Sequence, residues 1–146
     1  MKTLTTILGL FIVTLAFGQT AADKVLGKWY TDDKETIVEI YKTGEKYFGK
    51  VVWLMEENED DGTPKVDDEN PDAKLQKRPI MGLNILKGFS YDSEDKEWAD
   101  GTIYDPKNGK TYDCYMWIEK AGEIQIKGFV MGMRFIGRST TWTKAE

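Results

Sequence analysis

The chain has 146 residues with 25 Asp or Glu, 20 Lys or Arg, one Cys and no His, which gives a formal net charge of −5. Without histidine it cannot build a Ser-His-Asp triad or a His-ligated metal site, and one cysteine excludes a Cys-rich zinc site and an internal disulfide. The acidic balance also disfavours nucleic-acid binding, which depends on Lys and Arg contacts to phosphates.

Residues 1–18 have the pattern of a secretory signal peptide. Lys2 provides a positive start, residues 4–17 form an apolar run without a charge, and Ala16-Phe17-Gly18 is a small-x-small cleavage site. A transmembrane anchor is the alternative, but a spanning helix needs about 20 apolar residues. We therefore expect residues 19–146 to be exported, to the periplasm or the medium, as one domain with no membrane span.

The exported part is predicted to be all-β. Segments with period-two alternation, rich in β-branched and aromatic residues, follow one another between turn residues, as in a meander of antiparallel strands. Closure of eight such strands into an up-and-down barrel removes both exposed sheet edges. The expected strands are 24–31, 35–42, 46–54, 83–91, 97–104, 110–119, 123–131 and 134–143.

Alternation also predicts which side chains point inward. Val38 in the second strand, and Val51 and Trp53 in the third, lie on the apolar face of their strands. In the fifth strand the parity changes between Trp98 and Ile103, which predicts a β-bulge near Gly101.

The sixth strand carries the single cysteine. Cys114 shares an apolar face with Tyr112 and Met116, so we expect a buried, unreactive thiol.

The long connection at residues 55–79 contains two different segments. Residues 56–69 are strongly acidic and indicate either a solvated loop or a calcium site. For calcium, an EF-hand-like spacing is approximated by Glu57, Glu59, Asp61, Gly62 and Asp68. Asn70-Pro71-Asp72 is a helix-start signal, which predicts one short helix before Pro79 and a lid at the barrel mouth.

Several spaced motifs resemble a known family. They are Gly27-x-Trp29, Asn70-Pro71-Asp72-x-x-Leu75-x-x-Arg78-Pro79-x-x-Gly82-Leu83, Trp98-x-x-Gly101-x-Ile103-Tyr104-Asp105-Pro106-x-x-Gly109-Lys110-x-Tyr112 and Arg138-x-x-x-Trp142. Together they resemble the bacterial exported family of unknown function DUF2147 over nearly the whole of residues 19–146. The resemblance implies a lipocalin-like or streptavidin-like barrel. It implies no catalytic residues, because none are established for that family.

The resemblance to lipocalin-like barrels also suggests how the barrel closes. In such barrels an early Trp is covered by an Arg of the last strand, which combines cation–π attraction with closure of one end. We expect Trp29 and Arg138 to form this pair.

The functional prediction is non-catalytic binding of a small apolar ligand in the bacterial envelope, without a cofactor or a metal. An eight-stranded barrel is just wide enough to be filled by side chains or to hold one small ligand. A packed structural or protein-interaction module is therefore the alternative, and an enzyme built on carboxylates, Tyr112 or Lys87 ranks third. The expected ligand-lining residues are Val38, Val51, Trp53, Trp98, Tyr112 and Met116.

Overall fold

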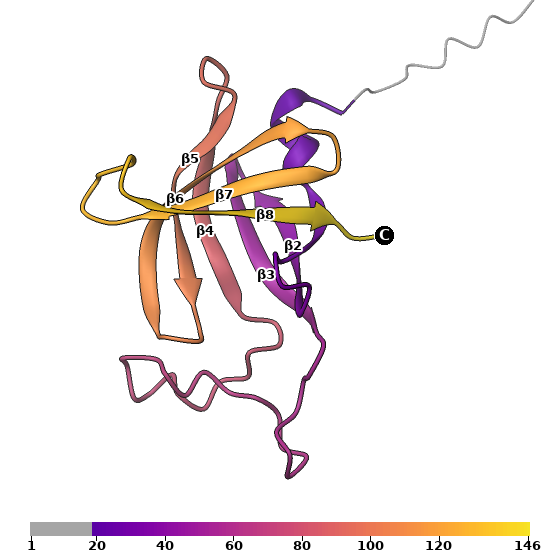
Figure 1. The fold of residues 1–146 in the computed structure, drawn as a ribbon, viewed down its shortest axis with the longest axis vertical. Helices are drawn as coiled ribbons and strands as arrows, with labels where there is room; N and C mark the ends of the chain where they lie inside the picture. Colours follow the sequence, from indigo (N-terminus) through magenta and orange to yellow (C-terminus); the bar gives the residue numbers. More distant parts are fainter. Residues whose placement is uncertain (1–18) are drawn as a thin grey trace, which may run out of the picture.

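The computed structural model describes residues 19–146, and the expected signal peptide lies outside them. Eight antiparallel strands, hydrogen-bonded in chain order, close into a barrel (Figure 1). A 3-10 helix, η1 (Ala21–Val25), precedes β1 (Gly27–Tyr30), β2 (Thr36–Thr43), β3 (Lys46–Leu54), β4 (Asn84–Asp92), β5 (Glu97–Asp105), β6 (Lys110–Lys120), β7 (Glu123–Phe129) and β8 (Gly137–Lys144). The predicted eight-stranded barrel is confirmed.

The first and last strands close the barrel by pairing with each other. Trp29 lies opposite Lys144, and Tyr30 lies opposite Thr143. Both strands are shorter than predicted. Residues 24–26 belong to η1 and the bend after it rather than to β1, and β8 begins at Gly137 because residues 130–136 form the β7–β8 connection.

One end of the barrel is closed by η1. Val25 is fully buried, and the indole N–H groups of Trp29 and Trp98 donate hydrogen bonds to the carbonyl oxygens of Val25 (2.8 Å) and Ala22 (3.0 Å). The helix therefore plugs the barrel with apolar contacts while its carbonyl groups stay hydrogen-bonded. Nothing helical in residues 19–146 has the length and apolar character needed to cross a bilayer.

Two local irregularities set which side chains face inward. The β5–β6 register shifts between Trp98 and Gly101, so the predicted bulge near Gly101 is confirmed. A second shift separates the pairs Ile37–Trp53 and Val38–Val51, which leaves Val52 as an extra residue in β3. This second bulge turns Trp53 to the outer face, where it is 38% exposed. The predicted inward orientation of Trp53 is therefore wrong.

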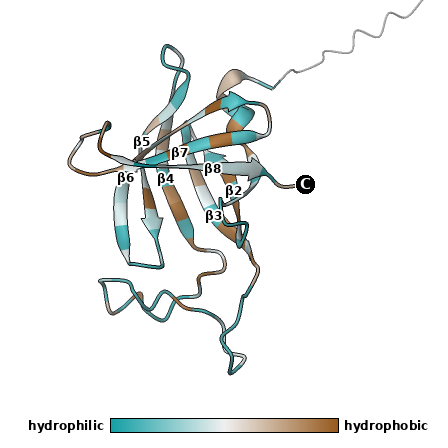
Figure 2. Cartoon of the chain, viewed as in Figure 1, coloured by the Kyte–Doolittle hydropathy of each residue, from teal (hydrophilic) through white to brown (hydrophobic). Residues whose placement is uncertain are grey.

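Figure 2 shows apolar segments on the strands and a mostly hydrophilic connection between β3 and β4. This connection lies at the end of the barrel opposite η1 (Figure 1). Isolated bridges join Asn58 to Pro64 and Val66 to Pro79. The predicted short helix is absent from it: residues 70–78 form successive turns, with the Leu75 and Arg78 N–H groups each bonded to a carbonyl three residues earlier. A helix that began near Asn70 and ended before Pro79 would contain too few residues to be stable.

The same connection packs closely against the β5–β6 turn. Gly109 has φ of +70°, and a Cβ atom there would overlap the carbonyl oxygen of Glu69. We expect Gly109→Ala to lower the free energy of unfolding by about 2–4 kcal/mol, from backbone strain plus the overlap. Gly44→Ala is the matched control, because Gly44 has φ of +62° with nothing within 4 Å of the added Cβ. Urea unfolding of both variants measures the difference, and equal losses would show that the close approach has no energetic weight.

Candidate functional site

The barrel interior is packed in one half and hollow in the other. Near η1 the interior is filled by large side chains, among them Trp29, Tyr47, Phe89, Trp98 and Met116, each 2% exposed or less. Toward the other end the inward positions include small residues such as Thr36, Gly128 and Thr140. Large side chains fill the first half, and small ones leave space in the second.

That space is a cavity of about 1070 Å³ running from the barrel interior to its rim. Its volume slightly exceeds the range of about 300–1,000 Å³ that is typical of small-molecule sites. The interior part of the wall is mostly apolar and consists of Val51, Leu54, Ile80, Ile85, Ile103, Tyr112, Ile126, Thr140 and Trp142. Such a wall suits an apolar molecule rather than a highly polar one.

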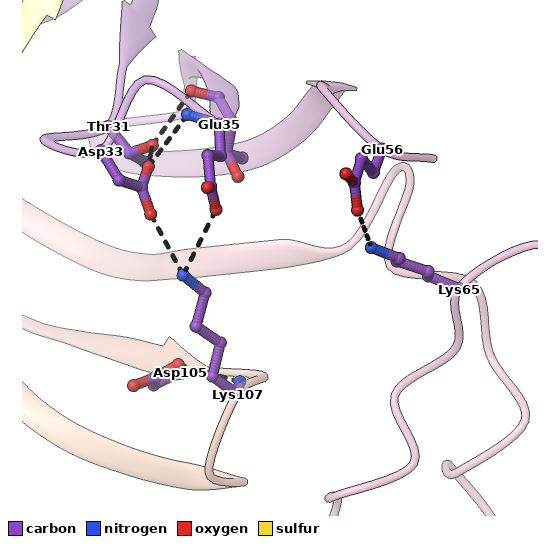
Figure 3. A network of polar contacts seen from close by, with 8 residues as sticks. Thr31, Asp33, Glu35, Glu56, Lys65, Asp105 and Lys107 are labelled. Carbon is purple, nitrogen blue, oxygen red and sulfur yellow. Dashed lines mark hydrogen bonds and ion pairs between the residues drawn. The ribbon is translucent and has the colours of Figure 1, made fainter. Parts of the chain in front are cut away.

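The rim of the cavity is charged, and most of its cations are paired. Lys107 in the β5–β6 turn reaches Asp33 (3.1 Å) and Glu35 (3.8 Å) of the β1–β2 connection (Figure 3). Within the β3–β4 connection, Lys65 pairs with Glu56 at 3.3 Å. The Lys107 ion pairs therefore link two loops that are far apart in sequence at the mouth of the cavity, whereas the Lys65 pair lies within one connection.

Asp33 is the most perturbed carboxyl of this rim. Burial raises its pKa, but hydrogen bonds from Thr31, the Glu35 N–H and Lys107 outweigh burial and hold the pKa at about 2. We expect Lys107→Gln to move the Asp33 pKa upward toward the ordinary value of 3.8, because a charged donor is lost. Carboxyl-carbon NMR titration measures the shift. An unchanged pKa would show that Thr31 and the Glu35 N–H suffice.

A second polar network fastens the β3–β4 connection to the barrel wall. The Asp67 side chain is fully buried and accepts hydrogen bonds from Tyr104 Oη (2.5 Å), Asn70 Nδ2 (2.9 Å) and Arg78 Nε (2.8 Å). Arg78 also forms an ion pair with it at 2.8 Å. Tyr104 borders the cavity, so this network positions both the connection and part of the cavity rim.

The six predicted ligand-lining residues lie in three different places: the cavity wall, the packed core and the outer face of the barrel. Val51 and Tyr112 line the cavity. Val38, Trp98 and Met116 point inward but belong to the packed core. Trp53 lies on the outer face, where its ring packs edge-on against Tyr30 with 6.1 Å between centroids.

The prediction that Arg138 covers Trp29 is wrong, because a different cation lies over the Trp29 ring. Trp29 is buried as expected, but the charge over its ring is Lys144, with Nζ 4.5 Å from the ring centroid and 2.8 Å from the Leu26 carbonyl oxygen. Arg138 lies at the opposite end of β8 and lines the cavity. Six residues along a strand span about 20 Å, so Arg138 cannot reach Trp29.

Cys114 is buried in the core, as predicted. Its burial raises the pKa of the thiol, which keeps it protonated and unreactive.

Two of the acidic residues considered as calcium ligands have other surroundings in the structure. Asp61 accepts hydrogen bonds from the N–H and hydroxyl groups of Thr63, and Asp68 lies at the cavity rim. Within residues 19–146, no three carboxylate, thiol or imidazole groups are close enough together to hold a metal ion.

Sequence reasoning missed several residues of the cavity. Leu54 became inward-facing through the β3 bulge, and Ile80 follows directly after Pro79, where the predicted lid segment ended. Asp67 was hidden in an acidic run, where only its place shortly before the Asn70-Pro71-Asp72 motif set it apart.

The comparisons with known proteins bear on the whole domain. The family model for DUF2147, described as an uncharacterized protein conserved in bacteria, matches residues 27–144. The chain belongs to this family. For DUF2147 the match spans every strand of the barrel, from the first residue of β1 to the last residue of β8.

A solved structure supports the same architecture for this DUF2147 chain. This chain is similar to protein HP1028 from Helicobacter pylori, which is described as belonging to the lipocalin family, with a TM-score of 0.70. The identity is 20%, and the match covers 84% of this chain and 83% of that chain. At this identity the likeness establishes a lipocalin-like fold. No curated protein matches the sequence.

Proposed function

We propose that the protein is an exported, non-catalytic binding protein that holds a small, largely apolar molecule in the open half of its barrel. The observation that carries this proposal is the cavity of about 1070 Å³ with an apolar inner wall and a charged rim. Apolar surface of a ligand would be removed from water by the wall, while the rim would contact its polar end.

The packed-module alternative has one observation in its favour. The β7–β8 connection, which lines the cavity through Val130 and Ile136, exposes four large apolar side chains, namely Val130, Met131, Phe135 and Ile136. Exposed apolar side chains gathered in one place are typical of interaction surfaces. A protein partner would contact these side chains without filling the barrel.

Native mass spectrometry of the protein purified from its own host tests the binding proposal. We expect an added mass that solvent extraction releases. Thr140→Trp should abolish the added mass by filling the cavity, whereas the matched variant Ser139→Trp, on the exposed outer face of the same strand, should retain it. If both variants kept the added mass, the ligand would bind outside the cavity. A protein with no bound mass and no affinity for added apolar molecules would contradict the proposal.

A further inference from the structure

The cavity contains one cation whose direction follows from the strand register. In β8, Trp142 lies opposite Ile124, Thr140 lies opposite Ile126, and Arg138 lies opposite Gly128. Directly paired residues of antiparallel strands project to the same face. Ile124 and Ile126 are buried inside the barrel, so Arg138 also projects from the inner face.

Gly128 leaves the space beside Arg138 open. A Cβ atom at Gly128 would meet Ile103 and Tyr112 at 3.5 Å, which confirms that this position faces the cavity. Because Gly128 has no side chain, nothing on the paired strand covers the stem of Arg138. Arg138 therefore lines the cavity from a strand, at its exposed end, where apolar and aromatic residues also line the wall.

Arg138 differs from the other cavity cations in its partners. Lys107 and Lys65 are held by carboxylates of the rim. Within residues 19–146, Arg138 has no carboxylate within ion-pair distance, although Arg78 and Arg134 are both paired. A guanidinium offers five N–H donors in a planar fork that matches a carboxylate or a phosphate group.

Tyr112 supplies a further donor on the same part of the wall. Its hydroxyl oxygen accepts a hydrogen bond from Asn108 Nδ2 at 3.1 Å, which leaves the hydroxyl hydrogen to be donated. Below Arg138, the inward residues Thr140 and Trp142 continue along β8 at about 7 Å intervals into the apolar interior. The cavity thus presents a cation above an apolar channel.

We propose that the ligand is an amphiphilic anion, whose carboxylate or phosphate head binds Arg138 while its apolar tail lies against Ile126, Thr140 and Trp142. This inference rests on the proposed binding function and specifies its ligand class. The exposed carboxylates of the rim oppose it only weakly, because at physiological salt the field of an exposed charge is screened within about 8 Å.

Displacement of the uncharged fluorescent probe N-phenyl-1-naphthylamine by four ten-carbon compounds tests the inference. Decanoate and decyl phosphate carry an anionic head, decanol is neutral and decylamine is cationic. We expect at least one anion to bind about tenfold or more tightly than decanol, as for a charge-assisted hydrogen bond. The anion with the larger gain in affinity over decanol identifies the preferred head group.

Variants make the test specific to Arg138. Arg138→Gln should remove the preference for the anion while leaving the affinity for decanol unchanged. Arg134→Gln is the control, because it removes the same charge from a residue that pairs with Glu97 outside the cavity wall, and it should keep the preference. Equal affinities for all four compounds, or tightest binding of decylamine, would overturn the inference but not the proposed function. Failure of the probe and of all four compounds to bind would overturn the proposed function itself.

Discussion

Replacement of Asp67 by alanine is expected to lower the free energy of unfolding by about 2–4 kcal/mol and to release the β3–β4 connection. The carboxylate is fully buried and accepts hydrogen bonds from Tyr104, Asn70 and Arg78. Its loss leaves these donors without their acceptor, which is costly in a buried network. Urea unfolding measures the free energy, and limited proteolysis within residues 56–82 measures the release.

Asp68→Ala is the matched control for this prediction. Asp68 is the next residue, carries the same charge and is exposed. Its replacement should change the free energy of unfolding by no more than about 0.5 kcal/mol, as for most surface substitutions. If both variants were equally stable and equally resistant to protease, Asp67 would not hold the connection.

The contribution of Asp67 should also depend on pH. Burial raises its pKa, but the hydrogen bonds from Tyr104, Asn70 and Arg78 outweigh burial, so the pKa lies below the ordinary value of 3.8. A carboxyl with a lowered folded-state pKa stabilises the protein above its unfolded-state value and loses this effect as the pH falls through the folded-state pKa. The stability difference between the wild type and Asp67→Asn should therefore shrink below pH 3.8. A constant difference would contradict this.

Replacement of Trp29 by alanine is expected to cost about 3–5 kcal/mol, because a large buried side chain leaves a cavity. Trp29 is 2% exposed, and its indole N–H donates to the Val25 carbonyl oxygen at 2.8 Å. Its loss also removes one of the two indole hydrogen bonds that hold η1 against the closed end of the barrel. Thermal and urea unfolding measure the effect.

Two cation variants decide which residue closes the barrel with Trp29. Lys144→Gln should cost about 0.5–1 kcal/mol, the usual range of an exposed cation–π contact. Arg138→Ala should cost no more than about 0.5 kcal/mol, since this side chain lies in the cavity of the other half. A larger loss for Arg138→Ala than for Lys144→Gln would contradict the assignment.

The barrel itself could be predicted because its signal is repeated along the chain. Period-two alternation recurs in most of the eight segments and turn residues separate nearly all of them, so the ambiguous fourth segment does not change the predicted fold. The Asp105–Gly109 turn is an example of the local signal, because it contains the turn-forming residues Asp105, Pro106 and Gly109 and its Gly109 N–H bonds to the Asp105 carbonyl oxygen at 2.8 Å.

The details that failed depend on single residues or on contacts between distant segments. One extra residue in β3 reverses the face of Trp53, and nothing around Val52 marks the bulge in the way that Gly101 marked the other. The choice of Lys144 over Arg138 as the cation above Trp29 depends on the β1–β8 register, which alternation alone does not fix.

The position of the cavity could not be predicted from the sequence either. Both halves of the barrel have apolar inward residues, so their pattern does not say which half is filled. The difference arises from η1, which plugs one end, and from small inward residues such as Gly128 and Thr140 near the other. Val51 and Tyr112 lie in the hollow half, whereas Val38, Trp98 and Met116 lie in the packed half.

The binding site is tested most directly by intermolecular NOEs between methyl-labelled protein and N-phenyl-1-naphthylamine. The account predicts saturable binding of one probe, with NOEs to the cavity methyl groups of Ile103 and Ile126 and none to Val38 in the packed half. NOEs confined to the exposed Met131 of the β7–β8 connection, which does not line the cavity, or no saturable binding, would contradict it.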